Sequence, residues 1–220
     1  MGNNIVLNAQ TGSGKTLGFL IPVLHDYFKT FYNPNINVDY NQQGYSTPKC
    51  LVISPTRELT VQIERELVKM IFDHNIRFTS LFGGMHLEKQ MNTLSTKQVD
   101  FVVACPGRLL DLLKRGKLNL SQVKYLVLDE ADRMMEMGFE LQLKEIFDDF
   151  GLKLREALVM MASATFPAKV MGIARRYIGD HVFIQLPKEQ NATNKNIEQV
   201  IKIVSEQDKL REIFTILNAY

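Results

Sequence analysis

A glycine-containing loop near the start of the chain has the residue types and spacing of a phosphate-binding site. It follows a short apolar run and precedes a helical stretch that continues through Leu24. The loop consists of Ala9, Gln10, Thr11, Gly12, Ser13, Gly14, Lys15 and Thr16. Glycines let the backbone wrap around an anion, and the amino end of the following helix adds positive potential. We predict that Lys15 meets the outer phosphates of a nucleotide and that the Thr16 hydroxyl binds Mg²⁺.

Two features leave an alternative for this loop. The usual pattern begins with Gly, whereas this chain has Ala9. A glycine-rich turn between a strand and a helix can also bind nothing. The flanking strand and helix favour phosphate binding.

An acidic cluster is the second set of candidate functional residues. It follows the apolar run Tyr125–Leu128 and reads Asp129, Glu130, Ala131, Asp132. In open α/β sheets, ligands bind beyond the carboxyl ends of the strands. We predict that Asp129 is an outer-shell partner of Mg²⁺ and that Glu130 orients or deprotonates the water that attacks a γ-phosphate. The alternative is an acidic helix start stabilised by the helix dipole, which local sequence favours for Asp132.

The elements that must position these groups alternate along the chain. Short runs rich in Val, Ile and Leu alternate with segments of helical period, which predicts a three-layer α/β domain with a mostly parallel central sheet flanked by helices. After Arg57, apolar residues recur every four positions and predict a helix with one buried face. The predicted strands are Ile5–Asn8, Cys50–Ser54, Phe78–Phe82, Phe101–Ala104, Tyr125–Leu128, Ala157–Met161 and Val182–Ile184.

Polar stretches mark the predicted boundaries. Residues 31–48 are rich in amides and turn formers, which predicts a surface loop or an insertion. Residues 1–186 would form the first domain, and the polar residues 187–196 a linker. Residues 197–220 contain a strand-like run, Ile197–Val204, and a helical run, Asp208–Leu217, which are too short to close a second core.

Composition narrows the class of protein. The 220 residues are 45% apolar and 23% charged, which suits one sizeable core. The net charge of +2 neither requires nor excludes a polyanionic partner, so any nucleic-acid site must be local. With only Cys50 and Cys105 there is no disulfide framework, which favours a reducing, intracellular compartment. No apolar run has the length of a membrane span, so we expect no membrane partner.

Together these motifs resemble the DEAD-box family of ATP-dependent RNA helicases. Further matches follow in the family's order at Pro55–Leu59, Gly83–Gly84, Pro106–Arg108 and Ser163–Thr165. The resemblance runs from about Asn4 to Ile184, and the residues around Asp132 are similar to the Vasa-like subgroup. It implies a RecA-like domain of the P-loop NTPase class, with ATP and Mg²⁺ as cofactors and with Lys15, Asp129 and Glu130 as catalytic residues.

The resemblance also implies a groove for the RNA backbone, coupled to the ATP site through Asp132, Ser163 and Thr165. Arg57 and Arg108 can pair with phosphates, and glycine N–H groups can approach them, without reading sequence. Each segment alone is more often a plain turn, helix start or strand end. The implied groove residues are Pro55, Thr56, Arg57, Glu58, Gly83, Gly84, Cys105, Pro106, Gly107 and Arg108.

Cys105 departs from the family, which usually has Thr there. A thiol is a weaker hydrogen-bond donor than a hydroxyl, so one prediction is a weaker or redox-sensitive RNA contact. The alternative, of equal weight, is that Cys105 is simply a small buried residue and that its backbone, not its side chain, makes the RNA contact.

The resemblance further implies that this is the N-terminal half of a two-domain enzyme. The adenine-reading glutamine segment, the downstream RNA motifs and the second domain's catalytic arginine are not in the sequence. Without a cationic group on the γ-phosphate, hydrolysis can fall by ~10³–10⁵. We therefore predict negligible RNA-stimulated turnover from these residues alone, a monomer, and a C-terminal RecA-like domain as the missing partner, with a cytoplasmic location slightly favoured over a nuclear one.

Two other functions remain open from the sequence. The first is a nucleotide-gated RNA clamp or protein-interaction platform without unwinding. The second is a different P-loop NTPase, such as a DNA translocase. Intact Lys15 and Glu130 favour the helicase.

Overall fold

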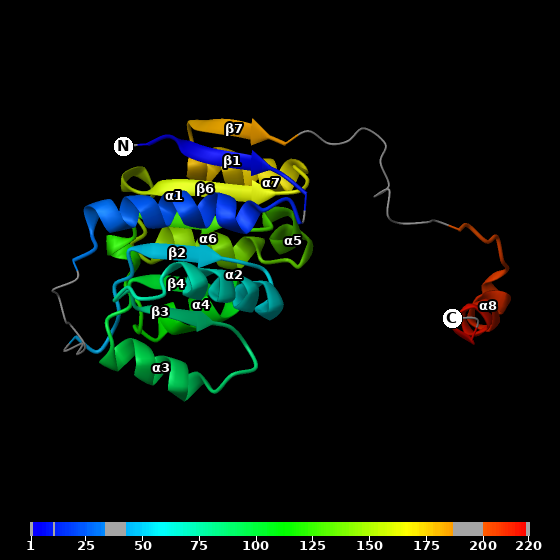
Figure 1. Ribbon diagram of the computed structural model, residues 1–220, viewed down its shortest axis with the longest axis horizontal. Coiled ribbons are helices and arrows are strands. Elements are labelled where there is room, and N and C mark those ends of the chain that lie inside the picture. Colours follow the sequence, from blue (N-terminus) through cyan, green and yellow to red (C-terminus); the bar gives the residue numbers. More distant parts are fainter. Residues whose placement is uncertain (1, 11, 34–42, 187–199, 219–220) are drawn as a thin grey trace. The chain divides into compact units, whose positions relative to one another are not determined.

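A computed structural model describes residues 2–10, 12–33, 43–186 and 200–218. The chain divides into two compact units, Met1–Leu186 and Pro187–Tyr220. In the first unit, a central sheet lies between two layers of helices (Figure 1). The three-layer α/β architecture predicted from the sequence is confirmed.

The sheet of the first unit has seven strands, and every strand pair is parallel. Their order is β3-β4-β2-β5-β6-β1-β7. The inner strands β2, β4 and β5 are buried on both faces, which explains their unbroken apolar sequences. All seven predicted strands are present, with ends within two residues of the predictions. The strands are β1 (Asn4–Asn8), β2 (Cys50–Ile53), β3 (Phe78–Leu81), β4 (Phe101–Ala104), β5 (Tyr125–Leu128), β6 (Leu158–Ser163) and β7 (His181–Gln185).

Two apolar cores lie on opposite faces of the sheet. One contains Cys50 and Val52 with α1 and α2, and the other contains Leu51 and Ile53 with α3 to α7. Successive side chains of a strand point to opposite faces, so β2 contributes to both cores. The helices are α1 (Lys15–Thr30), α2 (Arg57–Met70), α3 (Leu87–Thr96), α4 (Pro106–Lys114), α5 (Ala131–Glu136), α6 (Glu140–Asp149) and α7 (Ala168–Ile173), with single turns at Leu120–Gln122, Leu154–Glu156 and Ala174–Ile178.

Helix α1 is longer than predicted. It continues past Pro22 and past the predicted end at Leu24 as far as Thr30. Pro22 is exposed, so its ring lies on the solvent side of the helix. The buried residues Phe19, Val23 and Tyr27 form an apolar stripe that runs past it. Packing of that stripe outweighs the missing backbone hydrogen bond of the proline.

Two predictions about the irregular segments need correction. The strand predicted at Ile197–Val204 is wrong for residues 200–204, which have no regular structure; residues 197–199 lie outside the described part. A strand needs a hydrogen-bonding neighbour, and residues 200–218 contain none. In the segment 31–48, predicted as a surface loop or an insertion, exposure is wrong for Ser46, which is fully buried and whose hydroxyl donates to carbonyl oxygens of Leu94 and Lys97. Residues 34–42 and the predicted linker 187–196 lie outside the described residues.

In the second unit, a short turn at Glu206–Asp208 leads into α8 (Lys209–Asn218). This helix matches the helical run predicted at Asp208–Leu217. Its apolar residues Leu210, Phe214 and Leu217 are all exposed. Across the described ranges of both units, no helix combines the length and apolarity needed to cross a membrane.

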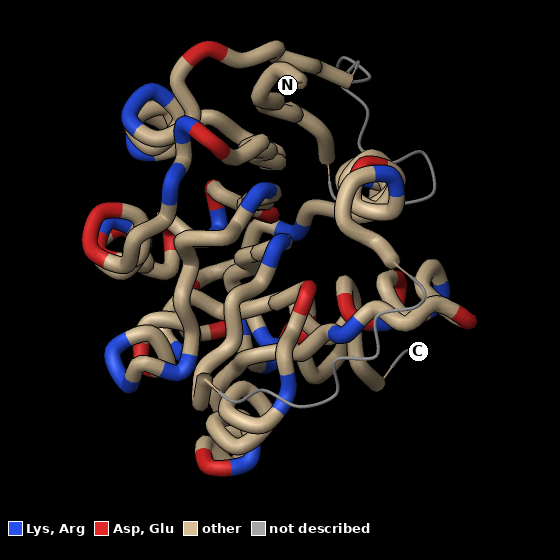
Figure 2. The backbone as a smooth tube through the Cα atoms, turned by 90° about the vertical axis from the view of Figure 1, so that its left-hand side faces the viewer, with Lys and Arg blue, Asp and Glu red and all other residues tan. Residues whose placement is uncertain are grey.

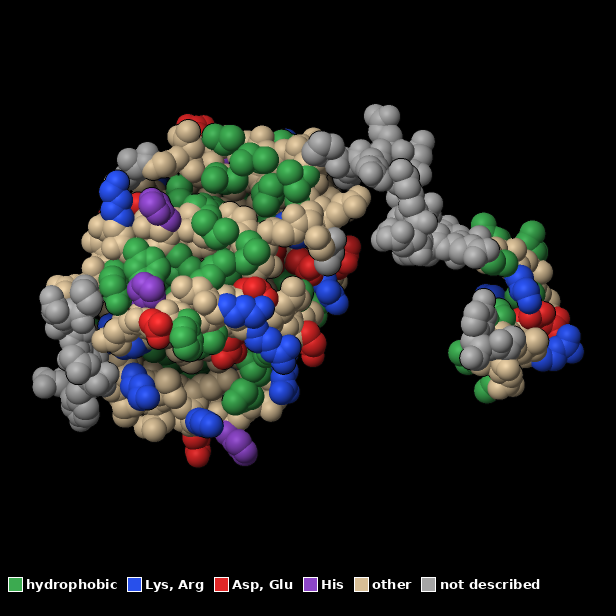
Figure 3. All heavy atoms as spheres, in the orientation of Figure 1, with side chains coloured by type: hydrophobic (Ala, Val, Ile, Leu, Met, Phe, Trp, Pro, Cys, Tyr) green, Lys and Arg blue, Asp and Glu red, His purple; other side chains and the backbone are tan. Residues whose placement is uncertain are grey.

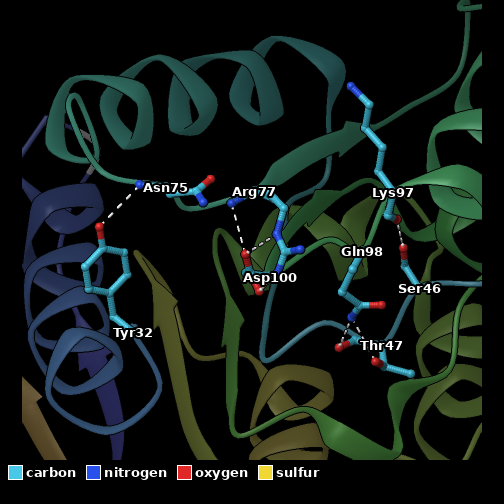
Figure 4. A network of polar contacts seen from close by, with 8 residues as sticks. All are labelled: Tyr32, Ser46, Thr47, Asn75, Arg77, Lys97, Gln98 and Asp100. Atoms are coloured by element: carbon cyan, nitrogen blue, oxygen red, sulfur yellow. Dashed lines mark hydrogen bonds and ion pairs between the residues drawn. The ribbon is translucent and has the colours of Figure 1, made fainter. Parts of the chain in front are cut away.

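A polar network lies at the amino ends of β3 and β4, opposite the predicted motifs (Figure 4). The backbone N–H and Nε of Arg77 both donate to Asp100 Oδ2 at 3.0 Å, and Arg77 Nη2 donates to Oδ1 at 3.0 Å. Burial, together with a hydrogen bond to Asp100, raises the pKa of Tyr27 far above its usual value. Asp100 therefore joins α1, the start of β3 and the start of β4. A cavity of about 890 Å³ opens at this same edge, beside Tyr125 and Lys124, and is remote from the predicted site.

Candidate functional site

The strand order sorts the predicted site residues into two groups along one edge of the sheet. The phosphate loop follows β1, the acidic cluster follows β5, and Ser163 is the last residue of β6; these three strands are neighbours. The three segments predicted to line an RNA groove follow β2, β3 and β4, which are also neighbours. Because all strands are parallel, their carboxyl ends meet at the same edge (Figure 1). The structure thus brings all the predicted segments to one side of the molecule.

The phosphate loop has the backbone needed to surround an anion. Gly12 and Gly14 have φ angles of 83° and 85°, in the left-handed region that favours glycine. Gly14 caps α1, and within the described residues no side chain bonds to the first N–H groups of the helix and no acidic residue lies in its first turn. Those N–H groups are therefore suited to receive an anion. Thr11 lies outside the described residues.

Internal contacts hold the loop in place. The Ser13 hydroxyl donates to the Gln10 carbonyl at 2.7 Å, and the Ala9 N–H donates to the Ser163 carbonyl at 3.1 Å. Lys15 is only 8% exposed, and its Nζ donates to the Ala9 carbonyl at 3.0 Å. The ammonium group lies back across the loop, and since it has three donors this contact still allows it to meet phosphate oxygens.

Asp129 is a buried carboxylate at the end of β5. Burial raises its pKa to about 6; the nearby charge of Lys15 acts in the opposite direction, and that of Glu130 adds to the rise. Its Oδ1 accepts the Glu130 N–H at 3.1 Å. A carboxylate this poorly solvated is stabilised by a cation, so it fits the predicted role at Mg²⁺.

The donor set also suits Mg²⁺. The described residues hold no cluster of three or more His, Cys, Asp or Glu that could enclose a metal. Mg²⁺ commonly takes one or two protein oxygens and completes its shell with water and substrate phosphates. Thr16 would supply such an oxygen directly, and Asp129 would act on the ion from the outer shell, as predicted.

The burial of Asp129 predicts a gain in stability for Asp129→Asn without Mg²⁺. Between the usual pKa of 3.8 and the folded value of about 6, the folded state holds a proton that the unfolded state lacks. The free energy of unfolding therefore falls as pH rises through this window, and the penalty is complete above it. We expect Asp129→Asn to raise that free energy by about 1–3 kcal/mol at pH 7.5 in EDTA.

Urea unfolding of both proteins between pH 4 and pH 8 would measure this gain, which should disappear at the acid end. Asp149→Asn, at an exposed position of α6, is the control and should show no such pH-dependent gain. A lower stability of Asp129→Asn at pH 7.5 would contradict the expected destabilisation by the buried charge.

Glu130 has an unusual backbone. Its φ and ψ are both 53°, a left-handed conformation that a non-glycine residue adopts at a cost of about 1–3 kcal/mol. The residue is 8% exposed, and its Oε2 accepts from Arg133 Nη1 at 3.4 Å. The turn places its carboxylate beside Asp129 at the sheet edge, as the predicted role in orienting water requires.

Asp132, Ser163 and Thr165 form one hydrogen-bonded cluster. The Thr165 N–H and hydroxyl both donate to Asp132 Oδ2 at 2.9 Å, and the Asp132 N–H donates to Ser163 Oγ at 3.1 Å. Burial alone would raise the pKa of Asp132, but the hydrogen bonds from Thr165 and Ser163 hold it below its usual value. Asp132 also lies in the first turn of α5, so its position is compatible with both predicted roles, at the helix start and in coupling.

On the other half of the edge, two arginines lie beside the glycine pair. Arg57 is exposed, and its guanidinium lies over the Phe82 ring, 5.2 Å from the centroid. Gly84 has a φ of 80°, and a Cβ there would come within 3.3 Å of Arg57 Nη1. Arg108 is half-buried in the first turn of α4. The Thr56 hydroxyl oxygen accepts the Leu59 N–H and so caps α2, which fixes Arg57 and Glu58 at the helix start.

Cys105 points inward. Its Sγ lies 3.3 Å from the Thr60 hydroxyl, which also contacts Ser54 Oγ at 2.8 Å and donates to the Thr56 carbonyl at 2.9 Å. Burial raises the pKa of the Cys105 thiol, so little thiolate is present near neutral pH. These contacts favour the second interpretation, in which Cys105 is a small packed residue.

Sequence reasoning missed three polar residues of this region. Thr60 and Gln90 are buried, and Arg133 contacts Glu130. Gln90 had a detectable signal, because it interrupts the apolar period of its helix. Thr60 and Arg133 had none, since their roles depend on segments distant in sequence or on a left-handed turn.

Known proteins resemble the chain in sequence and in fold. Residues 1–173 match the family model for the DEAD/DEAH box helicase. A DEAD box protein from the hyperthermophile Methanococcus jannaschii has 33% identity and a TM-score of 0.70, with 98% of this chain and 53% of that chain covered. A hypothetical ATP-dependent RNA helicase from Sulfolobus tokodaii has 32% identity and a TM-score of 0.68, with 84% and 48% covered.

The chain spans about half the length of these two proteins. The shared fold is the RecA-like one, with its parallel sheet between helical layers. From the matched residues and the sheet edge that they form, the chain belongs to the DEAD/DEAH box helicase family.

Proposed function

We propose that this chain is the ATP- and RNA-binding N-terminal RecA-like domain of an ATP-dependent RNA helicase. The observation that carries the proposal is the division of one sheet edge into a phosphate half and an arginine-glycine half, with the cluster of Asp132, Ser163 and Thr165 in the first. The Sulfolobus tokodaii protein is described as a hypothetical ATP-dependent RNA helicase.

In the nucleotide half, each residue has a distinct task. The loop from Ala9 to Thr16 binds the phosphates through its backbone N–H groups, and Lys15 uses its remaining ammonium donors to meet the outer ones. Thr16 would bind Mg²⁺ directly and Asp129 would act from its outer shell; the ion, when bound, would neutralise charge on the phosphates. Glu130 orients the attacking water and accepts its proton.

Ser163 connects nucleotide binding to the rest of the edge. Its carbonyl accepts the Ala9 N–H, and its hydroxyl accepts the Asp132 N–H and donates to the Thr165 carbonyl at 2.7 Å. Movement of the phosphate loop would therefore shift Thr165 and the start of α5. We infer that this contact relays the nucleotide state towards the RNA groove.

In the RNA half, contacts would be made to the backbone rather than to bases. Arg57 and Arg108 offer guanidinium groups for phosphates, and the exposed Gly83, Gly84 and Gly107 permit close approach of N–H groups. Acidic and basic residues are both spread around the first unit (Figure 2), so affinity would come from this local set. Binding should weaken steeply with salt and depend little on sequence.

The second unit is proposed as the start of a second RecA-like domain. Exposed apolar residues along α8 suit a helix that packs in a larger core. The two structural relatives are about twice as long as this chain. The complete protein would then act as a monomer in which ATP and RNA bring two domains together.

Two measurements test this function. In the first, a labelled single-stranded RNA is bound to the chain with Mg²⁺ and a non-hydrolysable ATP analogue, and unlabelled RNA or DNA of the same sequence competes. Preferential competition by RNA is expected, and equal competition by DNA would favour a DNA translocase. In the second, ATP hydrolysis is followed with and without RNA. Robust RNA-stimulated turnover would contradict the predicted need for a second domain.

Replacement of Cys105 by Thr should leave RNA affinity nearly unchanged under reducing conditions. The half-buried thiol contacts Thr60, and a Thr hydroxyl can make the same contact. RNA affinity of both proteins, with and without dithiothreitol, would test this. A clear gain in affinity for Cys105→Thr, or a loss on mild oxidation of the parent protein, would instead support the prediction of a weakened, redox-sensitive contact.

A further inference from the structure

A buried glutamine occupies a core-facing position of α3. Leu87, Met91 and Leu94 form the helix face that packs against the core, and Gln90 lies on the same face at helical spacing. Gln90 is 5% exposed. A polar side chain at such a position destabilises the fold unless its amide is hydrogen-bonded. The contacts of this amide therefore indicate why an apolar residue is not there.

Both ends of the Gln90 amide are hydrogen-bonded. Its Oε1 accepts from Arg108 Nη1 at 2.7 Å, and its Nε2 donates to the Phe82 carbonyl at 3.4 Å. Because guanidinium cannot accept and a carbonyl cannot donate, these partners fix the orientation of the amide. Arg108 also donates weakly to the Met85 carbonyl, at 3.4 Å from both Nη1 and Nη2.

These bonds connect the two arginines of the proposed RNA half. Gln90 donates to the carbonyl of Phe82, the residue directly before the glycine pair. The Arg57 guanidinium lies over the ring of the same Phe82. Arg108 comes from α4, in a different segment of the chain. Gln90 thus joins the loop after β3 to the start of α4, and through Phe82 it fixes the position of Arg57 relative to Arg108.

The geometry points to Gln90 as a positioning residue that sets the spacing of Arg57 and Arg108 for successive RNA phosphates. The inference rests on the proposed function. Gln90 need not touch RNA, because it acts by aligning one guanidinium and one loop. Losing it should release Arg108 and the segment from Phe82 to Met85 together.

Gln90→Leu tests this role, because Leu suits the apolar face of α3 and cannot form either bond. We expect RNA affinity to fall about three- to tenfold, the effect of losing hydrogen bonds that hold a charged donor. The slope of log affinity against log salt should fall by about 1, as one phosphate contact is lost. Arg108→Ala should lose affinity similarly, and the double variant should lose little more, because the two residues act as one unit.

Two controls separate positioning from a loss of folding. Gln98→Leu removes another partly buried glutamine, which donates to the Thr47 carbonyl and hydroxyl away from the site, and should leave RNA affinity and salt slope unchanged. Affinity for the Mg²⁺ complex of an ATP analogue should be unchanged in Gln90→Leu. If that variant does not fold, Gln90→Met gives the same test with a more flexible side chain.

The outcomes distinguish this inference from the proposed function. Unchanged RNA affinity in Gln90→Leu, with a clear loss in Arg108→Ala, overturns the positioning role and leaves the RNA site intact. Fully additive losses in the double variant also overturn it. If the parent chain binds no RNA, the proposed function fails. Amide hydrogen exchange at residues 83–85 of Gln90→Leu then still tests whether Gln90 orders this loop. Exchange as slow in the variant as in the parent chain would overturn that ordering role.

Discussion

Glu130→Gln is expected to lower the rate of RNA-stimulated ATP hydrolysis by about 10²–10⁴-fold in a protein with both RecA-like domains. Gln has nearly the shape of Glu and can still accept from Arg133, so the left-handed turn and the position of Asp129 should persist. What is lost is the negative charge and the ability to take a proton from water. Affinity for ATP should therefore change little, since binding depends on the phosphate loop and Mg²⁺.

Turnover measured with saturating RNA, beside the affinity for labelled ATP, separates these two effects. Glu136→Gln, at an exposed position of α5, is the matched control and should hydrolyse ATP at the parent rate. A Glu130→Gln rate close to that of the parent would assign the water-activating role to another group. The variant also discriminates between candidate functions, since a clamp that needs only ATP binding would keep its cellular role without turnover.

Asp100→Ala is expected to lower the free energy of unfolding by about 3 kcal/mol, because it leaves a partly buried guanidinium without its carboxylate. Asp100 accepts three hydrogen bonds from Arg77, and its own side chain is 12% exposed (Figure 4). The buried Tyr27 phenol would lose its partner too. As these contacts lie at the opposite edge from the site, loss of stability should not be accompanied by loss of nucleotide affinity at low temperature.

Urea unfolding monitored by circular dichroism would measure the effect. Asp111→Ala is the control, because its ion pair with Arg115 is solvent-exposed and should contribute far less. The double variant with Arg77→Ala should be less destabilised than the sum of the two single variants. A loss below that of Asp111→Ala would show that the Arg77 and Asp100 pair does not support the fold.

Much of the architecture follows from sequence periodicity. Buried parallel strands such as Phe101–Ala104 are short apolar runs, and the order of helices and strands specified a three-layer domain. The phosphate loop and the acidic cluster were predictable because their chemistry lies in contiguous residues. The cluster of Asp132 and Thr165 lacks such contiguity, because its members are 33 positions apart in the sequence. It could therefore be predicted only from the resemblance to the helicase family.

Other features depend on packing that periodicity does not encode. Helix α1 passes through Pro22 because tertiary burial of Phe19 and Tyr27 outweighs local preference. The run at 200–204 has strand-like residues but no neighbouring strand. Residue type alone also left the direction of the Cys105 side chain undecided, and the Thr60 contact decides it.

Apolar side chains gather on the face of the first unit shown in Figure 3. Exposed apolar residues of α1 and β7 include Ile21, Val182 and Ile184. Neighbouring positions on β1 and α1 border a cavity of about 270 Å³ beside Lys15. Polar substitution of Ile21 would reduce exposed apolar area without touching the loop. Such a variant would be a convenient background for the binding experiments.

The place of β1 in the sheet has a consequence for synthesis of the protein. Among the seven strands, the one that carries the phosphate loop is made before the others, yet its neighbours are β6 and β7, which are the last two to be made. Until residues 158–185 have left the ribosome, β1 has no partner strands, and Ala9 has no Ser163 carbonyl to meet. A nascent chain should therefore gain nucleotide affinity only once the whole first unit has emerged, so that ATP binding reports completed translation of the domain.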